Sequence, residues 1–135
     1  MYVYDCNAIL NKSTKNRSDK EMIRSFTSLT GYLKFQGIHP GFHFMENKAS
    51  TALKRTMTTM NIKYQVVPPS NHREKNTDRS IQKFKNHFVA GLCSVDKDFH
   101  LQLWDRLLQQ TAISINLLMQ SITLPHISAY THTFG

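Results

Sequence analysis

The stretch VVPPSNHREKNTDRSIQKFKNHF, Val66 to Phe88, decides how the rest of the chain is interpreted. A β-type apolar run ends there at two prolines, which a central strand does not accommodate. After a polar, basic segment, apolar residues recur at helical spacing from about Asn76 onward. The first turn of that expected helix carries one acid, Asp78, among basic residues. The stretch therefore predicts a strand, a loop and a long helix, which is the repeating unit of α/β folds.

The N-terminal third of the chain predicts two short strands and a helix. The run YVYDCNAIL is rich in β-branched and aromatic residues and is interrupted by turn residues at 5–7, so we expect a second strand over 7–11. Ser18 and Glu21 form an S-x-x-E capping box ahead of apolar residues at helical spacing. Gly37 lies where that helix is expected to end.

The middle of the chain predicts a strand, a helix and another strand. GFHFMEN is a short apolar run, which we expect to be a buried strand ending at Glu46. ASTALKRTMTTM places its apolar residues on one helical face, and IKYQVV alternates apolar and polar residues as a strand does. Strands joined through a helix are expected to be parallel neighbours with a right-handed crossover.

The C-terminal half predicts two helices with apolar inner faces. The helix from about Asn76 is expected to bury four residues, Ile81, Phe84, Phe88 and Leu92. The last helix, from about Phe99, is expected to carry Trp104 and the surrounding leucines in the core. The fold class expected is therefore α/β, with a mixed sheet flanked by helices.

The composition is that of one globular domain, residues 1–135, with a basic surface. A hydrophobic content of 40% is too high for a disordered chain. The net charge of +8 favours a phosphate-bearing partner, nucleic acid first, although such charge can also serve solubility alone. Cys6 and Cys93 form no CxxC pair, and no apolar run approaches the roughly 18 residues of a membrane span. We expect an intracellular protein with free thiols and no membrane segment.

Two acids occupy positions where chemistry is plausible. Glu46 ends a predicted strand, and Asp78 opens a predicted helix after one intervening helix and strand. One crossover would bring both to the carboxyl edge of a parallel sheet, where ligands usually bind. The alternative for Asp78 is an acid that only complements the helix dipole, and for Glu46 a solvated acid past a strand.

The chain resembles, over essentially its whole length, the integrase catalytic core of copia-like long-terminal-repeat retrotransposons. The resemblance is carried by VPP-x-NHR, by Glu46 to Ser50 at the family's D-N-E/G-x-S, by Asp78-Arg79 at its N-x-x-E-R, and by Asn116 in LLQQTAISINLLMQ. It implies a ribonuclease-H-like three-layer fold in which three acids hold two divalent ions, Mg²⁺ or Mn²⁺. It also implies catalytic and metal-binding roles for Glu46 and Asp78.

The sequence departs from the family at all three acids. Glu46 stands where the family has Asp, and Asp78 where it has Glu. Mg²⁺ demands nearly ideal octahedral geometry at about 2.0–2.1 Å, so both exchanges displace a ligand. The family's first acid is expected to be absent, because Asp5, a weak stand-in, has the chemistry of a turn residue.

The strand that bears that first acid in the family is expected to be missing as well. It is the central strand of the family's sheet. By comparison with the family's core, the chain is expected to be incomplete at both ends. The second strand of the family's order is then expected to lie beside the fourth or to stay exposed, because buried unpaired amides cost about 1–3 kcal/mol each. A complete five-stranded sheet would contradict this expectation.

Basic residues gather in sequence around the two acids. Phosphate contact with DNA, without sequence specificity, is the interpretation we favour over a merely solvated surface. The candidate residues are Lys48, His72, Arg73, Lys75, Arg79 and Lys83. A zinc site is not favoured, since Pro40 and Gly41 separate His39 from His43 and no cysteine pair accompanies them.

Three functions follow from these observations. The favoured one is a catalytically inactive, integrase-core-like fragment that binds nucleic acid, with no cofactor. The second is an active two-metal polynucleotidyl transferase that uses Asp5, Glu46 and Asp78 with Mg²⁺ or Mn²⁺. The third is an α/β interaction module without a nucleic-acid role. A homo-oligomer is compatible with each, and an integrase role implies a nuclear location.

Overall fold

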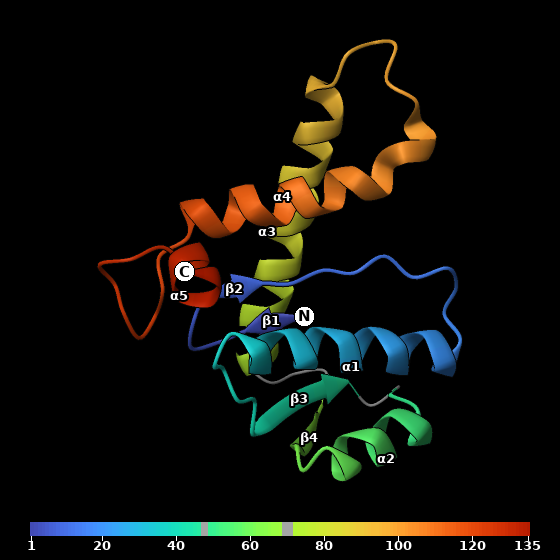
Figure 1. Ribbon diagram of the computed structural model, residues 1–135, viewed down its shortest axis with the longest axis vertical. Helices are drawn as coiled ribbons and strands as arrows, with labels where there is room; N and C mark the ends of the chain where they lie inside the picture. Colours follow the sequence, from blue (N-terminus) through green and yellow to red (C-terminus); the bar gives the residue numbers. More distant parts are fainter. Residues whose placement is uncertain (47–48, 69–71) are drawn as a thin grey trace. The chain divides into compact units, whose positions relative to one another are not determined.

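The computed structural model describes residues 1–46, 49–68 and 72–135, and for residues 46 and 72–76 it describes the backbone alone. The chain divides into two compact units. The first unit consists of residues 1–13 and 77–135, and the second of residues 14–76. Figure 1 shows the elements of both units, coloured along the sequence.

The first unit combines a small antiparallel sheet with helices. Tyr2 pairs with Ile9 across that sheet. The elements are β1 (Tyr2–Val3), β2 (Ala8–Ile9), α3 (His72–Ser94, in this unit from residue 77), the 3₁₀ turn η1 (Leu101–Leu103), α4 (Trp104–Leu118) and α5 (Ala129–Phe134).

The second unit is a strand-helix-strand arrangement preceded by a long helix. Its elements are α1 (Asp19–Phe35), β3 (Phe42–Glu46), α2 (Thr51–Thr59) and β4 (Lys63–Val67). β3 and β4 are parallel neighbours, with registers from Phe42 opposite Lys63 to Glu46 opposite Val67. Mixed α/β architecture and parallel pairing of these two strands are therefore confirmed.

Local sequence signals fix where the helices of the second unit begin and end. The Ser18 side chain accepts a hydrogen bond from the Glu21 N–H at 3.4 Å, so Ser18 caps α1 as predicted. The reciprocal bond of a capping box is not formed, because the Ser18 N–H donates to Asn16 Oδ1 at 3.0 Å and the Glu21 carboxylate pairs with Arg24. Ser50 caps α2 in the same way through the Leu53 N–H, at 3.2 Å. Gly37 has φ of 79° after α1, a conformation that glycine adopts without a Cβ penalty.

β3 is half exposed, and the expectation of a fully buried strand is wrong. His43 and Met45 point to the covered face, where the Phe26 ring of α1 meets the His43 ring at 5.4 Å between centroids. Phe42 and Phe44 alternate with them and are exposed. A continuous apolar run favours burial of both strand faces, but successive side chains point to opposite faces, and here only the face of His43 and Met45 is covered.

The core of the first unit forms where α4 and α5 contact β2. Ala8 and Ile9 of β2 are buried, as are Ile115 of α4 and Ala129 of α5. Asn116 of α4 is 0% exposed and bonds the backbone of Ile9 on both sides. Oδ1 accepts from the Ile9 N–H at 2.8 Å and Nδ2 donates to the Ile9 carbonyl at 2.9 Å.

Several expectations for the C-terminal helices are wrong. Ile81 is exposed, whereas Phe84, Phe88 and Leu92, expected on the same face, are half-buried. Ser80, one turn before Phe84, is buried, so the inner face of α3 passes through position 80 and not through position 81. Trp104 is 47% exposed and Leu101 is 68% exposed, since both precede the part of α4 that contacts β2 and α5. α3 begins at His72, four residues earlier than expected, and α5 was not predicted.

The strands form two separate two-stranded sheets within the described residues. β1 pairs with β2 and not with β3 or β4. Of the two expected arrangements, the N-terminal strand beside β3 is therefore not seen there, and the alternative, in which that strand stays exposed, is not contradicted. No five-stranded sheet occurs among the described residues, so the arrangement that would have contradicted the expectation is not seen there.

Candidate nucleic-acid interface

The two acids singled out by the sequence belong to different units. β3 ends at Glu46, as expected, but the Glu46 side chain lies outside the described residues. Asp78 is exposed on α3 in the first unit. Because α3 begins at His72, Asp78 stands in its second turn, and the expectation of a first-turn acid is wrong. A shared metal site for these acids stays a prediction.

Asp5 serves the fold through its backbone. It lies in the turn between β1 and β2, where Asn7 has φ of 54°. The Asp5 carbonyl accepts hydrogen bonds from the Thr123 N–H and the Thr123 hydroxyl, each at 3.2 Å. The turn therefore anchors the loop between α4 and α5. Among the described side chains, no group of three His, Cys, Asp or Glu residues is placed to hold a metal ion.

The six candidate DNA-contacting residues are described to different extents. Lys48 lies outside the described residues. His72, Arg73 and Lys75 belong to the first turn of α3, but their side chains lie outside the described part. Arg79 and Lys83 are exposed one helical turn apart on α3, so they share a face as predicted.

Amide side chains extend this basic face of α3. Gln82 Nε2 donates a hydrogen bond to Asn86 Oδ1 at 2.8 Å, and both residues are exposed. Because Asn86 Oδ1 faces Gln82 in this bond, the Asn86 amino group points away from Gln82. Arg79, Gln82, Lys83 and Asn86 therefore present cations and amide donors together, the groups that contact phosphate oxygens. We call these four residues the α3 face.

A hollow of about 430 Å³ adjoins the α3 face between α3 and α4. Lys83, Asn86 and His87 form its polar part. Ala90, Ile115 and Met119 form its apolar part. A cation, an amide and an imidazole beside apolar side chains are groups that suit an anionic or amphipathic ligand.

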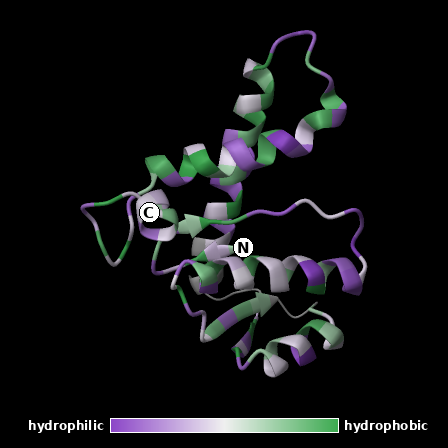
Figure 2. Cartoon of the chain, viewed as in Figure 1, coloured by the Kyte–Doolittle hydropathy of each residue, from purple (hydrophilic) through white to green (hydrophobic). Residues whose placement is uncertain are grey.

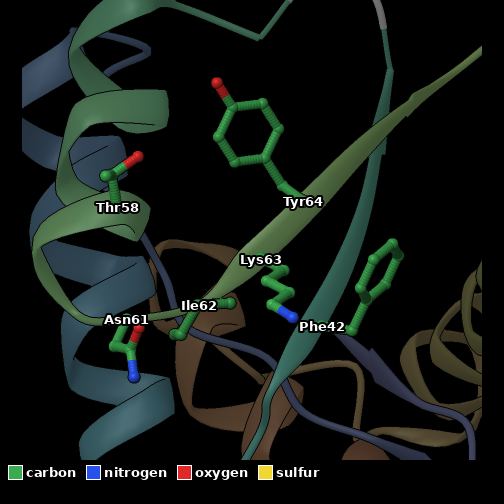
Figure 3. A pocket seen from close by; sticks show the side chains of 6 residues that line it. All are labelled: Phe42, Thr58, Asn61, Ile62, Lys63 and Tyr64. Carbon is green, nitrogen blue, oxygen red and sulfur yellow. The ribbon is translucent and has the colours of Figure 1, made fainter.

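A second hollow, of about 440 Å³, lies in the other unit where β3 and β4 begin. Figure 3 shows Phe42 and Lys63 together, with Tyr64 projecting from the opposite side of β4. Asn61, with φ of 57°, forms the turn before β4. This hollow lies at the amino ends of the parallel strands, away from the edge where Glu46 ends β3.

Positive charge is concentrated in the second unit. Eleven of the 17 lysines and arginines lie within residues 14–76, but only four of the nine acids do. The first unit, which carries the α3 face, is close to electrically balanced by the same count. Composition alone did not reveal this division, because the two segments of the first unit lie at opposite ends of the sequence.

The buried reactive groups of the first unit have structural roles. Ser121 Oγ lies 2.7 Å from His132 Nδ1, but Ser121 is only 3% exposed and its hydroxyl also accepts from the Leu124 N–H. Burial raises the pKa of the Cys6 thiol, which keeps it in the unreactive protonated form. Sequence spacing gave no signal for the Ser121–His132 contact, because α5 was not predicted.

Comparison of the sequence with models of known protein families and with curated proteins finds no match. Within the described residues, none of the helices is both long enough and apolar enough to cross a membrane.

Proposed function

We propose that the chain is an integrase-core-like fragment of retrotransposon type that binds nucleic acid through phosphate contacts and does not catalyse strand transfer. Support comes from the order of the elements, two short strands, a helix, and then parallel strands separated by a helix and followed by a long helix. This is the order of a ribonuclease-H-like core without its central strand. Asn116, placed by the resemblance on the last core helix, bonds β2 from α4.

The observation that carries nucleic-acid binding is the α3 face. Arg79 and Lys83 are exposed side by side, and the bonded amides of Gln82 and Asn86 lie next to them. Ionised donors form the stronger hydrogen bonds to phosphate, and amides add orientation. These side chains can bind phosphate oxygens without contacting the edges of the bases. We therefore expect binding without sequence preference.

Loss of catalysis follows from the exchanged acids. Two-metal displacement requires carboxylates that hold ions about 3.5–4 Å apart. Glu46 is one methylene longer than the family's Asp, and Asp78 is one shorter than its Glu. A misplacement of about 1 Å already costs about a hundredfold in rate.

Binding is tested by fluorescence anisotropy with a labelled DNA duplex at several salt concentrations. We expect affinity to fall steeply with salt, and Arg79→Ala combined with Lys83→Ala to reduce the slope of log K against log salt by about 2. Lys97→Ala is the control, because Lys97 is an exposed lysine outside the α3 face. It should not reproduce the change in slope that the α3 double variant causes. Absence of binding at low salt would favour the interaction module.

Catalysis is tested by strand-transfer and 3′-end-processing assays with Mg²⁺ and with Mn²⁺. We expect no product above a protein-free control. Product formation that disappears in Glu46→Ala and in Asp78→Ala would overturn the inactive assignment and support the two-metal transferase. The DNA-binding result is independent of this outcome.

A further inference from the structure

The solvent-facing side of α1 combines basic residues with a nearly fully exposed aromatic ring. Lys20 and Arg24 are one turn apart, and Phe35 follows Arg24 by eleven residues, close to three turns. All three are exposed, and Phe35 is 85% exposed. The buried side of the same helix holds Phe26 and Leu33, so its apolar stripe toward the core does not need Phe35.

Gly31 lies on this same side of α1 and has no packing role. A Cβ built at Gly31 meets nothing within 4 Å, and φ there is not positive. A glycine inside a helix lowers helix stability, yet here neither space nor backbone conformation requires it. Its effect is to leave the helix backbone uncovered at position 31, one turn before Phe35, which allows a ligand to approach closely there. We call Lys20, Arg24, Gly31 and Phe35 the α1 face.

The charge around the α1 face is complementary to a polyanion. Lys34, the residue before Phe35 in α1, is exposed as well. These residues belong to the unit that holds eleven of the 17 basic residues and four of the nine acids. Figure 2 shows hydrophilic residues toward the N-terminal end of α1. A strand lying along α1 would therefore meet cations before and at the exposed ring.

Arg24 is available to such a ligand. In the free chain its guanidinium pairs with Glu21 at 3.3 Å, within one turn of the same helix. The Arg24 side chain remains 63% exposed in that pair. The Glu21 side chain is 17% exposed, but an i,i+3 pair whose cation faces solvent is held weakly, so a phosphate can replace the carboxylate.

We propose that the α1 face binds single-stranded nucleic acid, with an unpaired base stacked on Phe35 and phosphates held by Lys20, Arg24 and Lys34. A ring this exposed offers a flat surface to a base, and stacking on it is tolerant of sequence. Duplex DNA cannot use it, because paired bases are stacked on each other. The α1 face is distinct from the α3 face and does not depend on the function proposed for it.

The affinity test uses the full chain and a labelled oligothymidine of about 15 nucleotides, within the range of single-strand site sizes. Phe35→Ala should weaken its binding about tenfold and leave duplex binding unchanged. Leu118→Ala removes an apolar side chain of similar exposure in the other unit, and should change neither. Arg79→Ala with Lys83→Ala should lower the affinity for duplex DNA more than the affinity for oligothymidine. This comparison tests the duplex site at the α3 face separately from the single-strand site at the α1 face.

Stacking is measured directly by placing the only indole on the α1 face. In a Trp104→Phe background, Phe35→Trp should show strong fluorescence quenching on addition of oligothymidine, and Lys20→Ala with Arg24→Ala should shift that titration to higher concentration. An unquenched indole, equal losses from Phe35→Ala and Leu118→Ala, or binding to phosphatidylserine vesicles in place of oligothymidine would each overturn the proposal.

Discussion

Asn116 shows how one side chain completes the hydrogen bonding of a short strand. Its amide occupies the place that a neighbouring strand would take beside β2, since it accepts from and donates to the same residue, Ile9. With Asn116 0% exposed, water cannot replace these bonds. The resemblance placed an asparagine at this position, but only the structure assigns its two bonds.

Asn116→Ala should lower the free energy of unfolding by about 2–5 kcal/mol, because it leaves a buried N–H and a buried carbonyl of Ile9 unpaired. Asn11→Ala is the matched control, since Asn11 makes one bond, from Nδ2 to the Leu108 carbonyl at 2.7 Å, and is only half buried. Its expected cost is about 1 kcal/mol. Urea denaturation measures both, and equal costs would contradict the structural role of Asn116.

His43 links the stability of the second unit to pH. Burial lowers the pKa of His43, so the folded chain resists protonating it while the unfolded chain protonates it near the usual pKa of about 6.5. Its contribution to stability is therefore complete above that pH and is lost as pH falls through about 6.5 toward the lower folded-state pKa.

His43→Gln should reduce the loss of melting temperature between about pH 7.5 and pH 5.5, because glutamine does not titrate there. His126→Gln, at an exposed histidine, is the control and should leave the pH dependence as it is in the parent chain. Thermal melts followed by circular dichroism give the comparison. An unchanged pH dependence in His43→Gln would show that other groups cause it.

At the scale of elements, the helix α1 contains a glycine in its interior, which lowers its stability relative to alanine at the same position. Gly31 interrupts it at an exposed position where a methyl group meets only open space. Gly31→Ala should raise the free energy of unfolding by about 0.5–1 kcal/mol, which urea denaturation can measure. Gly41→Ala, outside the helices, should give a smaller gain because no helix propensity is involved. Destabilisation by Gly31→Ala would mean that the added methyl group meets a neighbour.

The elements that sequence reasoning predicted well are those with a strong local signal. Ser18 and Ser50 cap helices through their own side chains, and β4 forms within IKYQVV as predicted. The alternating burial expected for β4 is not observed, because Tyr64 is exposed and Val67 is buried. α5 was missed because its six residues, AYTHTF, contain no apolar periodicity and are positioned by contacts with β2 and α4. Burial was misjudged at Trp104 and Ile81 because it depends on which neighbours cover a helix and not on residue type.

The candidate site was less accessible to sequence reasoning than the fold. Spacing correctly put Arg79 and Lys83 on one exposed face. The Gln82–Asn86 bond and the hollow beside Lys83 depend on rotamers and on the approach of α4, which no spacing rule supplies. The exposure of Phe35 was equally invisible, because a phenylalanine at helical spacing usually predicts core.

At the scale of the whole molecule, charge is distributed unevenly between two compact units. Like charges crowd residues 14–76, where acids are few. Such self-repulsion opposes folding, and salt at 0.1 M screens it between exposed charges that are more than about 10 Å apart. The stability of this chain should therefore depend on ionic strength in a way that a balanced chain's does not.

Raising NaCl from about 0.02 to 0.2 M should raise the melting temperature, because the Debye length shortens to less than about 8 Å and repulsion between like charges is screened more strongly. Lys54→Gln with Arg55→Gln should reduce that rise, since both charges lie in the crowded unit. Lys97→Gln, in the balanced unit, is the control. A melting temperature that falls with salt would indicate that attractive ion pairs outweigh the repulsion.

The parallel pairing of β3 and β4 also determines how the second unit reaches its native state. Antiparallel strands can close through a tight hairpin, but a parallel pair gains its bonds only after the intervening chain has crossed over. The chain loses the conformational entropy of this crossover before the hydrogen bonds between β3 and β4 form. We therefore expect formation of α2 to limit the folding rate of the second unit. Weakening the Ser50 cap should slow refolding more than it speeds unfolding, which makes a single hydroxyl a kinetic determinant of the sheet.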